Sequence, residues 1–135
     1  MTTKIFVNLP VKNLQKSMSF FTRLGFTFNQ QFTDEKAACM IISEKAFVML
    51  LVEDFFKTFT KKEISDAHKS TEVLIALSAE NREAVDSMVN TALEAGGAAV
   101  LDTQDHGFMY QRSFQDLDGH QWEVFWMDPG AVEPG

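Results

Sequence analysis

Near its C-terminal end the chain reads Gln111-Arg112-Ser113-Phe114-Gln115-Asp116-Leu117-Asp118-Gly119-His120-Gln121-Trp122-Glu123-Val124-Phe125. Strand-forming residues lie on both sides of Asp118-Gly119, a pair that supplies the positive φ angles of a tight turn. We therefore predict a β-hairpin with this pair as its two-residue turn. Its second strand carries Glu123 in an otherwise almost wholly apolar run, and a charge in such a run indicates a partner or a function.

The composition predicts one domain that works without nucleic acid or membrane partners. The 135 residues, 45% of them hydrophobic, are enough to bury a sizeable core. Nineteen acidic and twelve basic residues give a net charge of −7, and scattered basic residues argue against a nucleic-acid surface. No apolar run is long enough to cross a bilayer. Since Cys39 is the only cysteine, it cannot form a disulfide within the chain, and we predict a reduced thiol in a cytoplasmic protein.

The first part of the chain, about residues 4–52, shows the order β-α-β-β-β. A strand is predicted over 4–11, and Asn13 caps a helix whose apolar residues recur at helical spacing. Gly25 ends that helix. Three further strands are predicted over residues 26–33, 37–43 and 46–52.

The second part, about residues 71–128, repeats this order and predicts an internal duplication. A strand over 71–77 is followed by a helix that Ser78 or Asn81 caps and that Gly96-Gly97 ends. A short strand over 98–101, a polar loop over 102–107 and the hairpin complete the unit. Residues 129–135 are predicted to form a flexible tail.

The connector, residues 53–70, is predicted to hold one or two short helical turns and carries Phe55, Phe56 and Phe59. These phenylalanines either lie over the mouth of a cavity that the sheet encloses or complete the core. The sequence leaves both interpretations open.

Two segments resemble the vicinal oxygen chelate superfamily, which includes glyoxalase I, bleomycin-resistance proteins, fosfomycin-resistance enzymes and extradiol dioxygenases. Residues 14–26 are similar to the family's first helix, and Asp116-Leu117-Asp118-Gly119-His120-Gln121-Trp122-Glu123 is similar to its last hairpin. The resemblance implies an α+β fold in which two βαβββ repeats form half-barrel sheets around a central cavity. It also implies a homodimer.

The resemblance further implies a divalent metal site, but the sequence fills it incompletely. The four ligand positions of the family correspond approximately to Phe6, Met49, Glu72 and Glu123. Phe6 and Met49 offer neither the oxygen nor the nitrogen atoms that such ions require, so Glu72 and Glu123 are ligands only if a metal is bound. A shift of the strand register would turn Asn8 or Val7 inward in place of Phe6, depending on its size and direction, and Asn8 would be only a supplementary ligand.

Three residues are candidates for catalysis: His106, Arg112 and Glu123. With a two-residue turn, Arg112, Phe114, Glu123 and Phe125 share one face of the hairpin, so we expect Arg112 to reach the Glu123 carboxylate. The alternative is that Arg112 points to solvent. His106 is a candidate base or substrate-binding residue, although a loop histidine is often only a surface residue.

These observations favour a protein that binds a small organic ligand in an aromatic- and methionine-lined cavity, by sequestration or with turnover. The candidate ligand-binding residues are Phe6, Met49, Phe108, Tyr110, Arg112 and Phe114. The alternative is a metal-dependent lyase, isomerase or dioxygenase that uses Glu72 and Glu123. A third possibility is a structural or regulatory protein whose cavity is filled with side chains.

Overall fold

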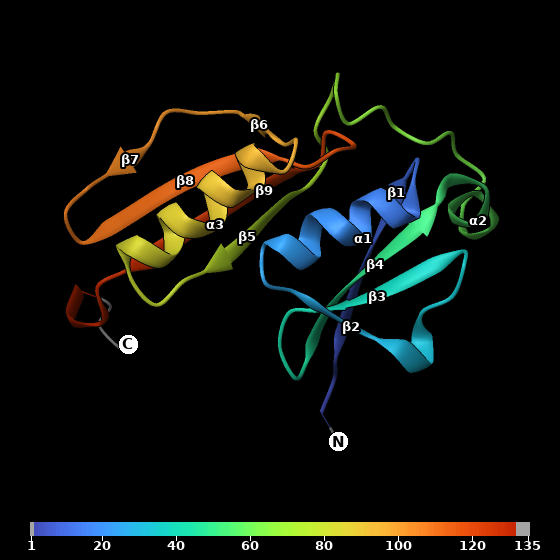
Figure 1. Ribbon diagram of the computed structural model, residues 1–135, viewed down its shortest axis with the longest axis horizontal. Coiled ribbons are helices and arrows are strands. Elements are labelled where there is room, and N and C mark those ends of the chain that lie inside the picture. The colour runs from blue at the N-terminus through green and yellow to red at the C-terminus, as the bar shows by residue number, and fades with distance from the viewer. Residues whose placement is uncertain (1, 132–135) are drawn as a thin grey trace. The chain divides into compact units, whose positions relative to one another are not determined.

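The computed structural model describes residues 2–131, and the chain divides into two compact units, Met1–Asp66 and Ala67–Gly135. Each unit contains one mixed β-sheet with a long helix packed on it (Figure 1). No helix within residues 2–131 is long and apolar enough to span a membrane. The boundary between the units lies in the predicted connector.

The first unit has the predicted order, and its sheet runs β1-β4-β3-β2. β1 and β4 are parallel, whereas the other neighbours are antiparallel. Its main elements are β1 (Ile5–Val11), α1 (Leu14–Arg23), β2 (Thr27–Asn29), β3 (Ala37–Ile41) and β4 (Ala46–Val52). Its short helical turns are η1 (Gln30–Phe32), α2 (Glu53–Phe56) and η2 (Lys57–Phe59).

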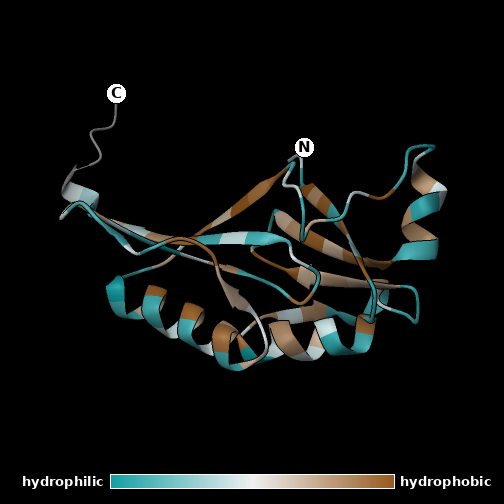
Figure 2. Ribbon diagram, turned by 90° about the horizontal axis from the view of Figure 1, so that it is seen from above, coloured by the Kyte–Doolittle hydropathy of each residue, from teal (hydrophilic) through white to brown (hydrophobic). Residues whose placement is uncertain are grey.

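Local side-chain chemistry sets the ends of α1 where the sequence predicts them. The Asn13 side chain accepts a hydrogen bond from the Lys16 backbone N–H at 3.0 Å, which satisfies one free donor of the first turn. Gly25 has a φ of 105°, a conformation that only glycine adopts without strain, and it ends the helix. Phe20 and Phe21 of α1 are almost completely buried. Because α1 is amphipathic, its apolar face covers one side of the sheet. Figure 2 shows hydrophobic and hydrophilic residues alternating along the helical ribbons.

The strand predicted over residues 26–33 is shorter than expected, because the chain turns after Asn29. The Asn29 side chain accepts a hydrogen bond from the Gln31 backbone N–H at 3.0 Å. The Thr33 hydroxyl donates to the Asn29 carbonyl at 2.8 Å. These local bonds compete with the strand ladder and stabilise the 3-10 turn η1 in its place.

The second unit repeats the βαβββ order, and its sheet runs β5-β9-β8-β6, with β7 also paired to β8. Asn81, not Ser78, caps the helix, since its side chain accepts from the Ala84 N–H at 2.8 Å. The predicted polar loop contains the two-residue strand β7. The elements are β5 (Leu74–Ser78), α3 (Arg82–Glu94), β6 (Ala98–Ala99), β7 (Gln104–Asp105), β8 (Met109–Gln115), β9 (Gln121–Met127) and η3 (Pro129–Ala131). The rest of the predicted tail, residues 132–135, lies outside the described residues.

The predicted hairpin between β8 and β9 forms, but its loop has three residues instead of two. The Asp116 N–H donates to the His120 carbonyl at 3.0 Å, and the Gly119 N–H donates to the Asp116 carbonyl at 3.1 Å. These bonds enclose residues 117–119. Gly119 has a φ of 87°. It is the left-handed residue that closes a three-residue hairpin loop.

The extra loop residue shifts the strand register by one and exchanges the two faces of β8 relative to β9. We predicted one shared face for Arg112, Phe114, Glu123 and Phe125, and this prediction is wrong. Arg112 pairs with Val124, and Ser113 pairs with Glu123. Arg112 therefore lies on the side that α3 covers, whereas Glu123 lies on the opposite side.

A buried carboxylate stabilises the hairpin loop. Asp116 is 5% exposed and accepts hydrogen bonds from the backbone N–H groups of Asp118 and His120 and from the Trp122 indole N–H, all at about 3 Å. Burial raises the pKa of Asp116. The three donors satisfy the carboxylate, so it can lie in the interior beside the fully buried Trp122.

Candidate functional site

The first sheet has an aromatic face turned away from α1, which we call the far face of the first sheet. Phe6 lies beside Phe47 across the parallel strands β1 and β4, and their rings stack with centroids 4.8 Å apart. Asn8 lies beside Met49 in the same ladder. Phe6 remains 49% exposed, although it is stacked on one side. The sequence-predicted residues Phe6 and Met49 therefore share this face.

A pocket of about 330 Å³ opens on this face, inside the first unit. It is lined by Asn8, Leu51, Phe56, Phe59 and Thr60. α2 and η2 supply the two phenylalanines. Phe59 is 68% exposed and Phe56 is half-buried, so neither completes the core. The pocket thus joins apolar walls to one amide and one hydroxyl.

The second sheet has a more polar far face, the side turned away from α3. Glu123 lies in the middle of this face, between Ala76 of β5 and Ser113 of β8. Gln111 and Phe125 form the next pair along the strands. Within residues 2–131, the Glu123 side chain makes no hydrogen bond or ion pair. Its partner is therefore not Arg112, contrary to our expectation.

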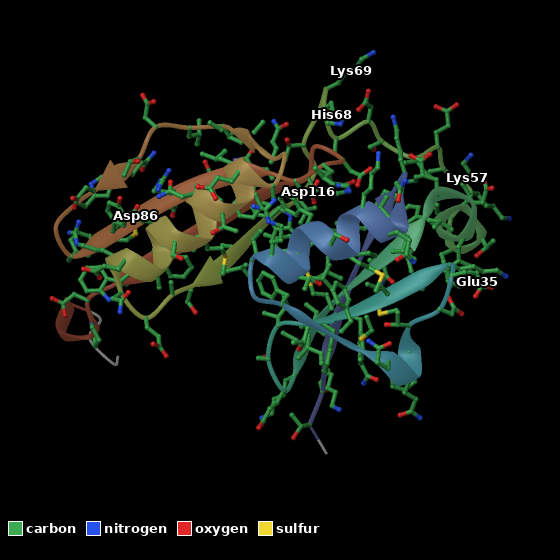
Figure 3. All side chains as sticks on the ribbon, viewed as in Figure 1. Glu35, Lys57, His68, Lys69, Asp86 and Asp116 are labelled. Atoms are coloured by element: carbon green, nitrogen blue, oxygen red, sulfur yellow. The ribbon has the colours of Figure 1, made fainter. Side chains whose placement is uncertain are left out.

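The side of the second sheet that faces α3 holds a compact polar network (Figure 3). Asp86 of α3 accepts hydrogen bonds from the Tyr110 hydroxyl at 2.7 Å and from Arg112 at 2.9 Å. Arg112 also donates to Asn90. The bond from Tyr110 and the guanidinium of Arg112 lower the pKa of Asp86, and the same bond raises the pKa of Tyr110. Phe114 is completely buried on this side.

Three predicted ligand-binding residues, Tyr110, Arg112 and Phe114, thus lie between the sheet and α3. Their side chains hold the helix to the sheet and do not belong to the far face. No local pattern in the sequence singles out Asp86 or Asn90, although their i, i+4 spacing places both on one side of α3.

A second ion pair ties β7 to the start of α3. Arg82 donates to both carboxylate oxygens of Asp105, at 2.7 and 2.9 Å, and to the Gly107 carbonyl at 2.9 Å. Its guanidinium also lies over the rings of Tyr110 and Trp126. The bond from Arg82 lowers the pKa of Asp105 to about 2, with a further contribution from the Gly107 N–H.

The predicted residues His106 and Phe108 lie just beyond β7 and are exposed, with ring centroids 6.4 Å apart. Among the described residues, none forms a hydrogen bond with the His106 imidazole. A general base needs a partner that orients its ring, so His106 has no such support within this part of the chain.

Comparison with known proteins gives the family. A sequence model described as Glyoxalase/Bleomycin resistance protein/Dioxygenase superfamily matches residues 5–124. The chain belongs to this superfamily. The predicted resemblance and the α+β fold of two βαβββ repeats are thereby confirmed. A search of curated proteins found no match to this superfamily member.

Solved structures show the same fold. Hypothetical protein SA1046 from S. aureus is 30% identical to this superfamily member, with a TM-score of 0.79 over 93% of this chain and 94% of that one. A glyoxalase/bleomycin resistance protein/dioxygenase family enzyme from Burkholderia phytofirmans PsJN is 15% identical, with a TM-score of 0.79 over 93% and 99% of the two chains. The fosfomycin resistance protein FosX from Listeria monocytogenes is 15% identical, with a TM-score of 0.66 over 93% of each chain.

The strand pairing allows equivalent positions of the two repeats to be compared within this superfamily fold. Asn8 lies beside Met49, and Ala76 lies beside Glu123. Asn8 and Ala76 each lie five residues before the asparagine that caps the following helix, so they are equivalent positions in the repeat. The predicted ligand positions Phe6, Met49, Glu72 and Glu123 supply a phenyl ring, a thioether and two carboxylates. This donor set does not fit a divalent cation.

Glu72, the other predicted ligand, precedes β5 and is exposed. Ala76 pairs with Glu123 and follows Glu72 by four residues, which corresponds to about 13 Å along an extended strand. The two carboxylates therefore lie at different levels of the sheet. Within residues 2–131, no group of three or more His, Cys, Asp or Glu side chains could hold a metal ion.

Proposed function

We propose that this superfamily member binds a small organic molecule in the pocket of the first unit. The observation that carries the proposal is the position of Phe59, which lines the pocket while 68% exposed. Leaving a large aromatic side chain in contact with water forgoes the free energy of burying it, and a bound ligand would recover part of it. Phe59 also packs edge-to-face on Phe55, with centroids 5.1 Å apart, which supports its position.

The lining of the pocket indicates the kind of ligand. Leu51, Phe56 and Phe59 offer apolar and aromatic contacts, whereas Asn8 and Thr60 each offer a donor and an acceptor. No charged side chain belongs to this lining. We expect a neutral, flat molecule with an aromatic part and one or two polar atoms, small enough for about 330 Å³.

Binding without metal-dependent turnover agrees best with the donor atoms of the chain. The predicted ligand positions carry Phe6, Met49, Glu72 and Glu123, and the two carboxylates alone do not fit a divalent cation. This is the sequestering version of the function predicted from the sequence. The metal-dependent lyase, isomerase or dioxygenase has no supporting observation among the described residues.

Titration with the neutral aromatic probe N-phenyl-1-naphthylamine, followed by its fluorescence, tests the proposal. We expect saturable binding that Phe59→Ala and Phe56→Ala each weaken about tenfold, the effect of losing one aromatic contact. Phe32→Ala is the matched control, because Phe32 is 59% exposed in the same unit but does not line the pocket. Equal affinities of the Phe59 and Phe32 variants, or no binding across a panel of neutral aromatic molecules, would contradict the proposal.

We also infer a homodimer, as the sequence resemblance implies. Ile5 and Phe6 at the start of β1 are 60% and 49% exposed, and such apolar residues commonly mark an interaction surface. Light scattering coupled to gel filtration measures the mass directly. Since one chain has a mass of 15.3 kDa, we expect a measured mass of twice that value. A mass of one chain at micromolar concentration would refute the dimer.

A further inference from the structure

A tight turn joins β7 to β8 at one end of the second sheet (Figure 1). Within this turn the His106 N–H donates a hydrogen bond to the Met109 carbonyl at 2.8 Å. The Gly107 N–H donates to the Asp105 carboxylate at 2.9 Å, and Gly107 adopts a left-handed φ of 80°. We call residues 105–109 the β7–β8 turn.

Two other parts of the second unit fix the β7–β8 turn from outside. Arg82, at the start of α3, donates two hydrogen bonds to the Asp105 carboxylate and one to the Gly107 carbonyl, at 2.7 to 2.9 Å. The chain after β9 adds a bond from the Asp128 N–H to the Phe108 carbonyl at 2.7 Å. A turn that is already fixed loses little conformational freedom when another surface binds it, so the β7–β8 turn is preorganised for binding.

The β7–β8 turn presents an aromatic side chain to solvent. Phe108 is 50% exposed, and the ring of the exposed His106 lies 6.4 Å from its own ring, centroid to centroid. Turn geometry does not require a phenylalanine, because turns favour Gly, Pro, Asn, Asp and Ser. Aromatic residues held in one place are typical anchors of protein–protein interfaces, since they bury a large area at a low cost in entropy.

The charges beside Phe108 and beside the pocket of the first unit have opposite signs. Asp128 is exposed and forms no ion pair among the described residues. Residues 57–62 include the pocket residues Phe59 and Thr60, and they contain three lysines and no acidic residue. The second unit has three basic and twelve acidic residues, a net charge of −9, whereas the first has nine and seven, a net charge of +2. This complementarity favours contact between the second unit of one copy and the first unit of another.

The pocket of the first unit is large enough to receive a phenylalanine side chain. A cavity of about 150 Å³ holds a benzene molecule. This pocket measures about 330 Å³, and Leu51, Phe56 and Phe59 give it apolar and aromatic walls. A benzyl group therefore matches the pocket in size and in chemistry.

We propose that Phe108 of one copy enters the pocket of a second copy and competes there with the small organic ligand. The inference rests on the proposed function, because it uses the same pocket, and it adds a regulation: the free pocket becomes scarcer as the protein becomes more concentrated. Each copy carries both a β7–β8 turn and a pocket, so two copies can make the contact reciprocally. The lysines of residues 57–62 attract the acidic second unit and so favour the encounter.

NMR of mixed full-length chains tests the contact. The ¹⁵N-labelled Phe108→Ala chain keeps the pocket but lacks the side chain that enters it, whereas the unlabelled Phe59→Ala chain keeps Phe108. When the second chain is added to the first, we expect the amide signals of β1 and of residues 53–60 to shift. The shifts should weaken as salt is raised. The probe N-phenyl-1-naphthylamine should reverse them, because it occupies the same pocket.

Two unlabelled double variants are matched controls. Phe59→Ala/Phe108→Ala should bind the labelled chain at least about tenfold more weakly than Phe59→Ala does. Phe59→Ala/Leu101→Ala should bind as Phe59→Ala does, because Leu101 is 55% exposed in the same unit but lies outside the β7–β8 turn. Equal binding by the two double variants, or shifts confined to elements away from the pocket, would overturn the proposal.

Failure of this inference and failure of the proposed function give different results. If the probe binds the pocket but the unlabelled chain causes no shift there, the docking of Phe108 is refuted and the proposed function stands. If the unlabelled chain shifts the pocket signals through Phe108 but no small aromatic molecule binds, the docking is supported and the proposed function fails. Shifts that the bound probe does not reverse would refute the competition.

Discussion

The Arg112 guanidinium donates a hydrogen bond of 2.9 Å to the Asp86 carboxylate, on the side of the second sheet that α3 covers. Asp86 is labelled on α3 in Figure 3. The Arg112 side chain is 19% exposed and that of Asp86 is 43% exposed, so water screens the pair only in part. The bond joins the helix to the sheet, and Tyr110 reinforces it.

A double-mutant cycle between Arg112→Met and Asp86→Asn should therefore show a coupling of about 0.5–1 kcal/mol in the free energy of unfolding. Urea denaturation followed by circular dichroism measures it. The same cycle between Arg112→Met and Glu123→Gln is the control and should show none, because Glu123 lies on the other face. Coupling to Glu123 instead of Asp86 would contradict the observed register.

Acid should weaken the attachment of β7 to α3. Because Arg82 lowers the pKa of Asp105 from its ordinary value of 3.8 to about 2, the folded state holds the ionised form more strongly than the unfolded state does. This stabilisation is complete above about pH 4 and is lost as the pH falls toward 2.

The stability difference between the native chain and Asp105→Asn should accordingly shrink between pH 5 and pH 2, as measured by urea denaturation at each pH. Asp102→Asn serves as the control, since Asp102 is exposed in the same segment and makes no ion pair among the described residues. A difference that stays constant over this range would show that the Arg82–Asp105 pair does not stabilise the fold.

Substituting Gly119 should destabilise the second unit through the backbone of the connector. Its φ is 87°, and a Cβ at this position would lie 2.8 Å from the His68 backbone N. Gly119→Ala combines left-handed strain with this clash, and we expect a loss of about 2–4 kcal/mol in unfolding free energy.

Gly107→Ala is the matched control, because Gly107 has a φ of 80° but nothing within 4 Å of the added Cβ. Strain alone should cost it about 1 kcal/mol. Thermal denaturation of both variants gives the comparison. If the two substitutions cost the same, the close approach of His68 to the hairpin loop has no energetic effect.

Removing the Asp116 carboxylate should cost more than removing an exposed one. Asp116→Ala leaves the indole N–H of Trp122 and two backbone N–H groups without their acceptor, and we expect a loss of about 2–4 kcal/mol. Asp102→Ala should change the unfolding free energy by less than about 0.5 kcal/mol. Urea denaturation with tryptophan fluorescence measures both, and similar values would contradict a structural role for Asp116.

Features that depend on neighbours in the sequence could be predicted from it. The caps Asn13 and Asn81 act on N–H groups three residues later, and Gly25 ends α1 by its own conformation. The strand and helix order of both repeats, and with it the family, follows from such local patterns. These interactions need little beyond the chain segment in which they occur.

The hairpin loop shows where local patterns were insufficient. Asp118-Gly119 is compatible with a two-residue turn or with the end of a three-residue loop, because both require a positive φ at glycine. The buried Asp116 accepts bonds from residues on the loop and from Trp122, and these contacts accompany the longer loop. The difference of one residue decides which face each side chain of β8 occupies.

The sequence by itself determined the βαβββ repeats, the helix ends and the superfamily, because periodicity, capping and turn chemistry act over a few residues. Only the tertiary structure decided that Arg112 meets Asp86, that Glu123 is left without a side-chain partner among the described residues, and that Phe59 lines a pocket. Pairing between strands depends on register, and exposure depends on what packs above a strand. Neither is encoded in the immediate neighbours of a residue.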